Sequence, residues 1–186
     1  MDVLEAIKTR RSIRKYKPAP VDDSTLRLVL DAARLAPSWA NTQCWRFIVI
    51  RDSNTKSAIA DTLTPGNRGA DALRQAPIAI IACAELGRAG YLRGEASSDK
   101  GDWYMFDVAL AMANLTLAAH SLGLGTVHIG AFDAKKVASI LGVPQGYCVV
   151  EMTPLGYPEF QPEARPRKEL SEIVFYEKFG QGEVRS

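Results

Sequence analysis

Three arginines lie within five positions near the N-terminus and are the first candidates for chemistry in this chain. Arg10, Arg11 and Arg14 surround Ser12 and follow a short predicted helix over residues 2–9. Guanidinium groups bind phosphate oxygens in pairs and a hydroxyl donates a further hydrogen bond, so this cluster suits a phosphate. A solvated turn after a helix, whose C-terminal dipole favours cations, is the alternative, and the cluster taken alone favours that alternative.

A second basic cluster lies near the other end of the chain, in a segment rich in proline. Arg165 and Arg167 flank Pro166. Alternate residues of an extended chain point to the same side, so the two arginines could reach one anion together. Solvated surface is again the simpler explanation for this cluster alone. The two clusters form one site only if the fold brings them together.

The segment from Ala36 to Phe47, APSWANTQCWRF, is the most informative part of the sequence. It combines two tryptophans with several polar side chains directly before a predicted buried strand. Asn41 and Gln43 both donate and accept hydrogen bonds, which is the pattern needed to bind the edge of a pyrimidine ring. Trp39 offers a flat apolar surface to a ring system, whereas Trp45, next to the strand, is more typical of a core residue.

Composition and charge exclude several classes of protein. The 186 residues are 47% hydrophobic and 24% charged, as in an ordinary globular protein, and we expect a single domain over residues 1–186. The 23 basic and 21 acidic residues give a net charge of only +2, so we expect no nucleic-acid partner and a strictly local anion site. Cys44, Cys83 and Cys148 are widely spaced, which indicates core residues and neither disulfides nor a metal site.

The sequence contains no sign of export or of membrane insertion. Asp2 and Glu5 stand where a signal peptide would carry positive charge followed by an apolar run. No apolar stretch reaches the roughly 20 residues of a membrane span without interruption. We therefore expect a cytoplasmic protein with no membrane partner.

The pattern of apolar residues predicts alternating helices and strands, so the expected fold class is α+β, a mixed α/β sandwich. The run over 78–83 is apolar throughout, typical of a strand covered on both faces. Residues 102–122 are apolar on nearly every face, which places that helix in a core or a subunit interface. Three prolines make residues 158–166 extended, and residues 170–179 form an amphipathic tail. Further helices are predicted over 24–36, 55–63 and 134–141, and further strands over 47–50, 126–129 and 147–153.

Four motifs in a fixed order resemble the FMN-dependent nitroreductase family. They are RRSIRKY from Arg10, APSWANTQCWRF from Ala36, LGLGTVHIGAFD from Leu122, and PLGYP from Pro154 with RPRK from Arg165. The resemblance extends over nearly the whole chain. It implies a central, mainly antiparallel sheet of four to five strands flanked by helices, and an interlocked homodimer with an extended C-terminal arm over residues 158–186.

The resemblance also implies which residues bind FMN. The first motif would hold the phosphate and ribityl chain, and Arg14 would lie at the N1/O2 edge of the flavin, where a cation raises the reduction potential. The second motif is supplied by one subunit to the flavin of the other. The third would pack beside the ring and direct a backbone N–H at N5, and the last would close the phosphate side. The implied cofactor-binding residues are Arg10, Arg11, Ser12, Arg14, Pro37, Ser38, Trp39, Asn41, Gln43, His128, Ile129, Gly130, Leu155, Gly156, Arg165 and Arg167.

Several positions need separate weighing. His128 could act as a general acid, but packing against the flavin is the favoured role. Asn67 is a further candidate for the pyrimidine ring that stays outside the predicted set. Cys44 stands where the family usually has proline, which should relax the loop without removing a cofactor contact. Residues 85–101 lie where the family varies its substrate lid, and they carry no signature of a particular electron acceptor.

The implied activity is an oxidoreductase reaction in which NAD(P)H delivers hydride to FMN and a nitroaromatic, quinone or related acceptor then takes the electrons. This ping-pong scheme requires no catalytic side chain, and none is predicted. Two alternatives stay open. One is related flavin chemistry on the same fold, such as dehalogenation or flavin fragmentation. The other is a flavin-binding protein without turnover.

Overall fold

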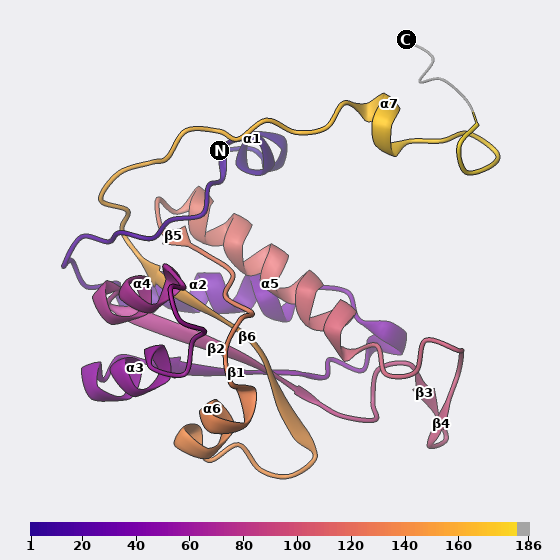
Figure 1. The fold of residues 1–186 in the computed structure, drawn as a ribbon, viewed down its shortest axis with the longest axis horizontal. Helices are drawn as coiled ribbons and strands as arrows, with labels where there is room; N and C mark the ends of the chain where they lie inside the picture. The colour runs from indigo at the N-terminus through magenta and orange to yellow at the C-terminus, as the bar shows by residue number, and fades with distance from the viewer. Residues whose placement is uncertain (182–186) are drawn as a thin grey trace.

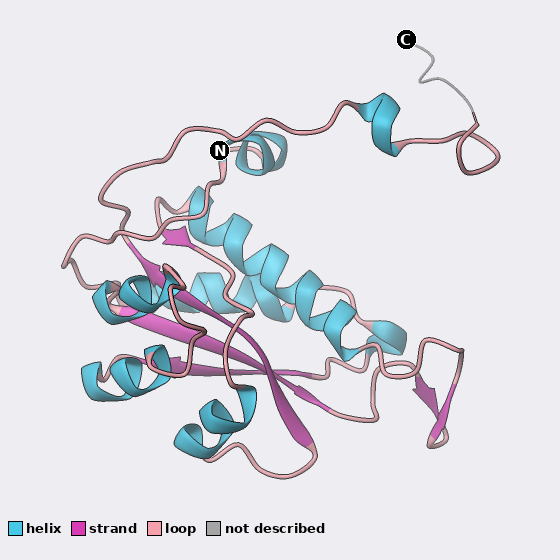
Figure 2. Ribbon diagram, in the orientation of Figure 1, coloured by secondary structure: helices cyan, strands magenta, loops and turns pink. Residues whose placement is uncertain are grey.

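A computed structural model describes residues 1–181 of the protein (Figure 1). Figure 2 shows helices on both sides of one central sheet, with a small hairpin apart from it. The helices are α1 (Val3–Thr9), α2 (Asp23–Arg34), α3 (Ser53–Ala60), α4 (Gly69–Gln75), α5 (Tyr104–Ser121), α6 (Ala134–Leu141) and α7 (Leu170–Ile173), with a 3₁₀ turn, η1, at Trp39–Asn41. The strands are β1 (Trp45–Ile50), β2 (Ile78–Glu85), β3 (Tyr91–Leu92), β4 (Glu95–Ala96), β5 (Gly125–Thr126) and β6 (Tyr147–Gly156).

The central sheet has the strand order β1-β2-β6-β5, and all neighbouring strands are antiparallel. This confirms the predicted α+β class and the mainly antiparallel sheet. β2 is buried along all but its last residue, because its sequence offers apolar side chains to both faces. A bulge in the pairing with β6 falls between Ala82 and Cys83.

Helices cover both faces of this sheet and bury alternate residues of β2. Ile80 packs with Met112 of α5 in a cluster that also contains residues of α2. Ile81, the next residue, packs with Ile59 of α3 in the cluster on the opposite face, to which α4 and α6 contribute. This alternation is the period-2 pattern of a strand. The result is a three-layer sandwich in which α5 lies in the core, as its apolar sequence predicts.

Local signals in the sequence fix the two ends of α2. The Asp22 carboxylate accepts a hydrogen bond from the Thr25 backbone N–H at 2.8 Å, which caps the N-terminus. The helix buries Leu26, Val29 and Ala33 and ends before Pro37, the predicted stop. After α2 the chain enters the loop of the second motif, which begins next to the N-terminal half of α5, because the Trp39 N–H donates to Asp107 there.

The predicted strand over 126–129 is shorter than expected. β5 ends at Thr126, because the Val127 N–H donates to the Thr153 hydroxyl at 3.2 Å instead of to a backbone carbonyl. Ile129 then pairs with Met152 in an isolated bridge. His128 lies between these two points. The break in strand pairing after Thr126 therefore positions the third motif.

The sequence patterns missed α4 and the β3–β4 hairpin. α4 has only seven residues between a Pro-Gly turn and a proline, too few to show helical periodicity. The hairpin turns at Arg93 and Gly94, both with positive φ (53° and 85°), and lacks the Asn-Gly or Asp-Gly signal of such turns.

The C-terminal arm leaves the body of the molecule, and α7 lies apart from the sandwich (Figure 1). Residues 158–166 are extended and largely exposed, as predicted. The amphipathic tail predicted over 170–179 contains only one short helix, α7, and residues 182–186 of the predicted arm lie outside the described part. Within residues 1–181, no helix combines the length and the apolar character needed to cross a membrane.

Candidate functional site

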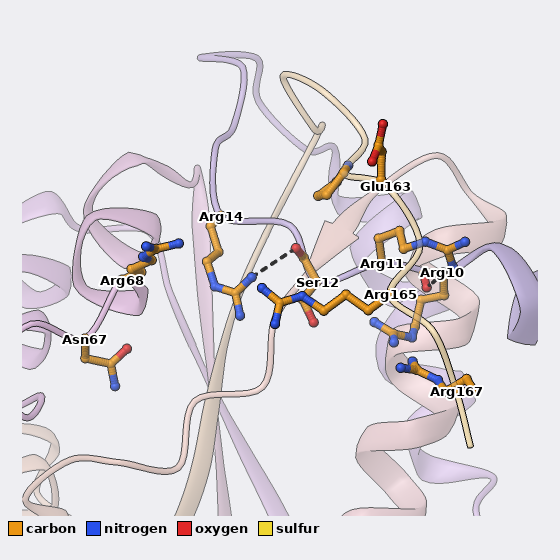
Figure 3. A pocket seen from close by; sticks show the side chains of 10 residues that line it. Arg10, Arg11, Ser12, Arg14, Asn67, Arg68, Glu163, Arg165 and Arg167 are labelled. Carbon is orange, nitrogen blue, oxygen red and sulfur yellow. Dashed lines mark hydrogen bonds between the residues drawn. The ribbon is translucent and has the colours of Figure 1, made fainter. Parts of the chain in front are cut away.

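A cavity of about 550 Å³ lies where the N-terminal segment, the turn before α4 and the C-terminal arm meet (Figure 3). We call it the arginine cavity. It brings together the two basic clusters from opposite ends of the sequence. The sequence alone could not show whether the fold would place them in one site. Its lining residues are Arg10, Arg11, Ser12, Arg14, Asn67, Arg68, Pro162, Glu163, Arg165 and Arg167.

The N-terminal side of the cavity is held by β5. The Ile13 backbone N–H donates to the Thr126 carbonyl at 2.8 Å, and Ser12 pairs with Thr126 in a parallel bridge. Ile13 is 5% exposed and packs inward, so its neighbours Ser12 and Arg14 point away from the core. The extended segment after α1 thus acts as a short additional edge strand that presents its polar residues to the cavity.

The C-terminal side of the cavity is held by the N-terminal segment itself. Lys17 N–H donates to the Tyr157 carbonyl at 2.9 Å, and Glu159 N–H donates to the Lys15 carbonyl at 3.1 Å. Further along the arm, the Gln161 amide donates to the Thr9 carbonyl at 3.0 Å. These contacts make the arm run beside the first motif and place Arg165 and Arg167 next to Arg10 and Arg11 (Figure 3).

Positive charge in the arginine cavity is not compensated by neighbouring carboxylates. Among the described residues, none of its six guanidinium groups lies within 4.0 Å of a carboxylate, whereas five arginines elsewhere in the protein form such ion pairs. Glu163 is the only acidic residue in the lining. Burial lowers the pKa of Arg10, and the positive charges of Arg11 and Arg167 lower it further. The cavity therefore favours an anion.

Asn67 and Arg68 complete the cavity on the side opposite Arg10 and Arg11 (Figure 3). The Asn67 side chain accepts from Gly69 N–H at 2.9 Å and donates to the Ala131 carbonyl at 3.3 Å, which ties it to the third motif. Asn67 was a candidate outside the predicted set. Arg68 belongs to no motif, and only its place before the unpredicted helix α4 brings it here.

The loop of the second motif lies away from the arginine cavity. Pro37, Ser38 and Trp39 line a different hollow of about 370 Å³, together with Trp103, Phe106, Asp107 and Leu110. Asn41 and Gln43 are exposed and hydrogen-bond to each other at 3.1 Å. Trp45 is 5% exposed and belongs to the core, as its position before the strand predicts.

Two neighbouring residues of the third motif, Ile129 and Gly130, differ in how their backbone N–H groups are used. Ile129 is buried and its N–H donates to the Met152 carbonyl at 2.9 Å, so this group is already used. Gly130 is exposed, and its N–H has no acceptor among the described residues. Nothing lies within 4 Å of the place where a Cβ of Gly130 would stand. The N–H of Gly130 is therefore available to a ligand, unlike that of Ile129.

His128 is paired with an acidic residue of β6. Its Nδ1 lies 2.9 Å from Glu151 Oε2, and its side chain is 45% exposed. The other carboxylate oxygen of Glu151 is buried and has no hydrogen-bond partner among the described residues. This contact orients the imidazole ring and holds Nδ1, which leaves Nε2 toward solvent.

Leu155 and Gly156 do not line the arginine cavity. Leu155 is fully buried in the cluster under α5, and both residues pair with β5. A Cβ at Gly156 would lie 2.5 Å from Pro77 Cδ, so glycine is required for this close approach. The two residues support the start of the arm instead of contacting a ligand there with side chains.

The sequence of residues 7–157 matches the Nitroreductase family, and the chain belongs to that family. A protein of Methanothermobacter thermautotrophicus, provisionally named NADH dehydrogenase/NAD(P)H nitroreductase, is 36% identical over 89% of this chain and 82% of its own length. The 5,6-dimethylbenzimidazole synthase of Rhodospirillum rubrum is 30% identical over 92% of this chain and 88% of that protein.

Solved structures show the same fold. A nitroreductase family protein from Clostridium novyi NT has a TM-score of 0.78 and 32% identity, and covers 97% of this chain and 96% of its own. An FMN-dependent nitroreductase from Clostridium difficile R20291 has a TM-score of 0.79 and 29% identity, over 95% of this chain and 99% of its own. The predicted family is therefore confirmed.

Proposed function

We propose that this protein is an FMN-dependent oxidoreductase that uses NAD(P)H to reduce a nitroaromatic, a quinone or a related acceptor in a ping-pong cycle. The names of its relatives support this activity, and they include the FMN reductase [NAD(P)H] of Bacillus subtilis, 30% identical over 89% of this chain. The observation that carries the proposal is the arginine cavity, in which six guanidinium groups converge without a carboxylate partner among the described residues.

The donor set of the cavity fits the phosphate half of FMN. Arg10, Arg165 and Arg167 would bind the phosphate oxygens, since guanidinium forks pair with phosphate. Burial lowers the pKa of Arg10 and the charges of Arg11 and Arg167 lower it further, and an anion would offset both effects. Ser12 would donate to the ribityl or phosphate oxygens. A volume of about 550 Å³ lies within the range of cofactor sites.

The other side of the cavity suits the ring of the cofactor. Arg14 and Asn67 offer a cation and an amide to the pyrimidine edge, and the exposed Gly130 of the third motif has an N–H without an acceptor among the described residues. FMN, when bound, supplies the hydride-accepting chemistry, and these groups position it and adjust its electrostatic environment. No acidic or nucleophilic side chain is assigned a catalytic step.

We include a homodimer in the proposal. The outer side of α1 exposes Val3, Leu4 and Ile7, and the arm exposes Leu170 and Phe179, the latter to 92%. The arm projects away from its own body (Figure 1), so a second copy is the natural partner for these apolar residues. The loop of the second motif, remote from the cavity of its own chain, would then serve the cavity of the partner.

Flavin absorption tests the proposal directly. The purified protein should be yellow or become so on reconstitution with FMN, and NADH or NADPH should bleach the colour under anaerobic conditions. Addition of a quinone should then restore it. A protein that takes up no FMN contradicts the assignment of the cavity, and one that holds FMN without bleaching is a flavin-binding protein without turnover.

The resemblance to 5,6-dimethylbenzimidazole synthase favours one second candidate, oxidative fragmentation of the flavin itself. The outcome of reoxidation in air separates the two activities. A reductase returns intact FMN after each cycle, as chromatography of the released flavin would show. Progressive loss of FMN with appearance of a benzimidazole product would favour the second candidate.

A further inference from the structure

A buried carboxylate in α5 holds the loop of the second motif. Asp107 is 0% exposed, and both of its carboxylate oxygens lie 3.1 Å from the Trp39 backbone nitrogen, which donates to them. The Thr42 hydroxyl donates to Oδ2 at 3.4 Å, and the Cys44 thiol donates to the same oxygen at 3.8 Å. One side chain thus binds the beginning, the middle and the end of the loop.

The loop that Asp107 holds has a costly backbone conformation. Ala40, Asn41 and Gln43 have positive φ angles of 44°, 57° and 49°, and none of them is a glycine. Side chains with a Cβ enter this region at a cost of about 1 kcal/mol or more each. The Gln43 N–H donates to the Ser38 hydroxyl at 3.0 Å, and the Asn41 and Thr42 N–H groups donate to the Ser38 and Trp39 carbonyls at 3.0 and 2.9 Å. These hydrogen bonds join residues of the loop to one another and do not tie the loop to the rest of the protein. An external anchor is therefore needed to keep these three residues in place.

Burying the carboxylate of Asp107 costs free energy of folding. Among the described residues, no lysine, arginine or histidine forms an ion pair with it, and Asp102 is the nearest charge acting on it, with the same sign. Burial raises the pKa of Asp107, and the hydrogen bonds from Trp39, Thr42 and Cys44 offset part of this rise, while Asp102 adds a smaller rise. Asp107 lies in the first turn of α5, where the helix dipole favours a carboxylate, but an apolar residue at this buried position would avoid the desolvation. Core packing alone gives no reason for a carboxylate here.

We infer that Asp107 is a positioning residue, which fixes the loop of residues 37–44 in the conformation that presents Trp39 and Asn41 to the cofactor site of the partner subunit. The inference rests on the proposed function for the purpose of the loop, although the anchoring itself rests on the contacts of Asp107 alone. Cys44 contributes to it: its thiol ties the end of the loop to Asp107, where the sequence predicted that this residue would relax the loop.

Two substitutions at Asp107 and one control test the inference in the full-length protein as purified. Asp107→Ala removes every acceptor, whereas Asp107→Asn keeps one oxygen for the Trp39 N–H. Thr116→Val is the matched control, because Thr116 is also buried in α5, at 2% exposed, and within the described residues its hydroxyl bonds only to the Ala113 carbonyl. Hydrogen exchange of the amides of residues 39–44 and the dissociation constant of FMN are measured for each variant.

We expect exchange in residues 39–44 to rise by about tenfold or more in Asp107→Ala and by less in Asp107→Asn, with FMN bound about tenfold more weakly in the alanine variant. Thr116→Val should change neither quantity. Wild-type exchange rates in both Asp107 variants would overturn the inference, as would equal effects of Thr116→Val. If Asp107→Ala does not fold, Asp107→Asn decides the question. A wild-type protein that binds no FMN would refute the proposed function, while the exchange rates would still decide whether Asp107 anchors the loop.

Discussion

Arg14 and Arg167 both line the arginine cavity, but they lie in different parts of it. Figure 3 shows Arg14 between Ser12 and the turn of Asn67 and Arg68, and Arg167 on the far side near Arg10. Neither forms an ion pair with a carboxylate among the described residues. Under the proposed function, Arg14 would lie at the ring of the cofactor and Arg167 at its phosphate.

Arg14→Ala should lower the reduction potential of the bound flavin more than it weakens FMN binding, because it removes a cation that stabilises the reduced ring. Arg167→Ala should do the reverse and raise the dissociation constant by about 10- to 100-fold, the effect of one charge-assisted hydrogen bond. Spectroelectrochemistry and fluorescence titration measure the two quantities. Arg27→Ala, an exposed arginine of α2, is the control. Equal effects of both variants on both quantities would refute the division.

His120 should report on the charge of the cavity. Its Nε2 lies 2.8 Å from the Thr9 hydroxyl, and its pKa is lowered first by burial and then by Arg10 and Arg11. The folded protein therefore prefers the neutral ring. The stability that His120 contributes is fully present above its ordinary pKa of about 6.5 and is lost as the pH falls from there through the lowered folded value.

His120→Gln should accordingly lose less free energy of unfolding than the wild type between pH 7.5 and pH 5.5. Urea unfolding at the two pH values measures the difference. Bound FMN should reduce it, since its phosphate offsets the field of Arg10 and Arg11. Parallel pH profiles for the variant and the wild type would contradict this account.

At the scale of residues, the sequence predicted which side chains could bind a ligand better than it predicted which side chains lie close together. The types of Arg10, Ser12, Arg165 and Arg167 indicate a phosphate site, and the fold does gather them. In the sequence, Asp107 is one of the few polar residues in an apolar helix, and the pattern gives no sign of its role. Its partner Trp39 lies 68 positions away, and no local pattern connects the two.

At the scale of elements, the close contact of β5 with the N-terminal segment positions the first motif. A Cβ at Gly125 would lie 2.6 Å from Ile13 Cγ1 and 2.7 Å from Ile13 Cβ. No side chain larger than hydrogen fits there unless the backbone of the segment moves. The glycine therefore sets how close Ser12 and Arg14 come to β5.

Gly125→Ala should destabilise the protein by about 1–3 kcal/mol, the usual cost of overpacking a core, and should weaken FMN binding as Ser12 and Arg14 shift. Chemical unfolding measures the first effect and flavin titration the second. Gly130→Ala is the control for stability, because nothing lies within 4 Å of its added Cβ. A Gly125→Ala variant as stable as Gly130→Ala would show that the contact relaxes freely.

The elements with a strong pattern were predicted, and those fixed by tertiary contacts were not. α2, α5 and β2 carry their own signals in capping, apolar periodicity and uninterrupted apolar sequence. α4 depends instead on the packing of Gly69, whose Cβ would lie 2.7 Å from Ile129 Cδ1. β5 ends early because of a single hydroxyl on a neighbouring strand, that of Thr153. Such contacts between distant segments leave no periodic trace in the sequence.

At the scale of the whole molecule, the exposed apolar residues of the arm predict association. Ile173→Lys combined with Phe179→Lys should raise the dissociation constant of the dimer by about 100-fold or more, because each apolar side chain contributes about 1.5–3 kcal/mol when buried. Light scattering over a range of concentrations measures it. Lys178→Glu changes a charge on the same arm and should leave the dimer intact. A double variant that stays dimeric at all concentrations would contradict this role of the arm.

The unpaired guanidinium groups of the arginine cavity also tie the lifetime of the chain to the supply of its cofactor. Burial lowers the pKa of Arg10, and the charges of Arg11 and Arg167 lower it further, so a bound anion should stabilise the folded protein. A ligand present at 100 times its dissociation constant adds about 2.7 kcal/mol to the free energy of unfolding. A cell that runs short of flavin would thus hold this protein in a form more open to proteolysis, and its abundance would follow the size of the flavin pool.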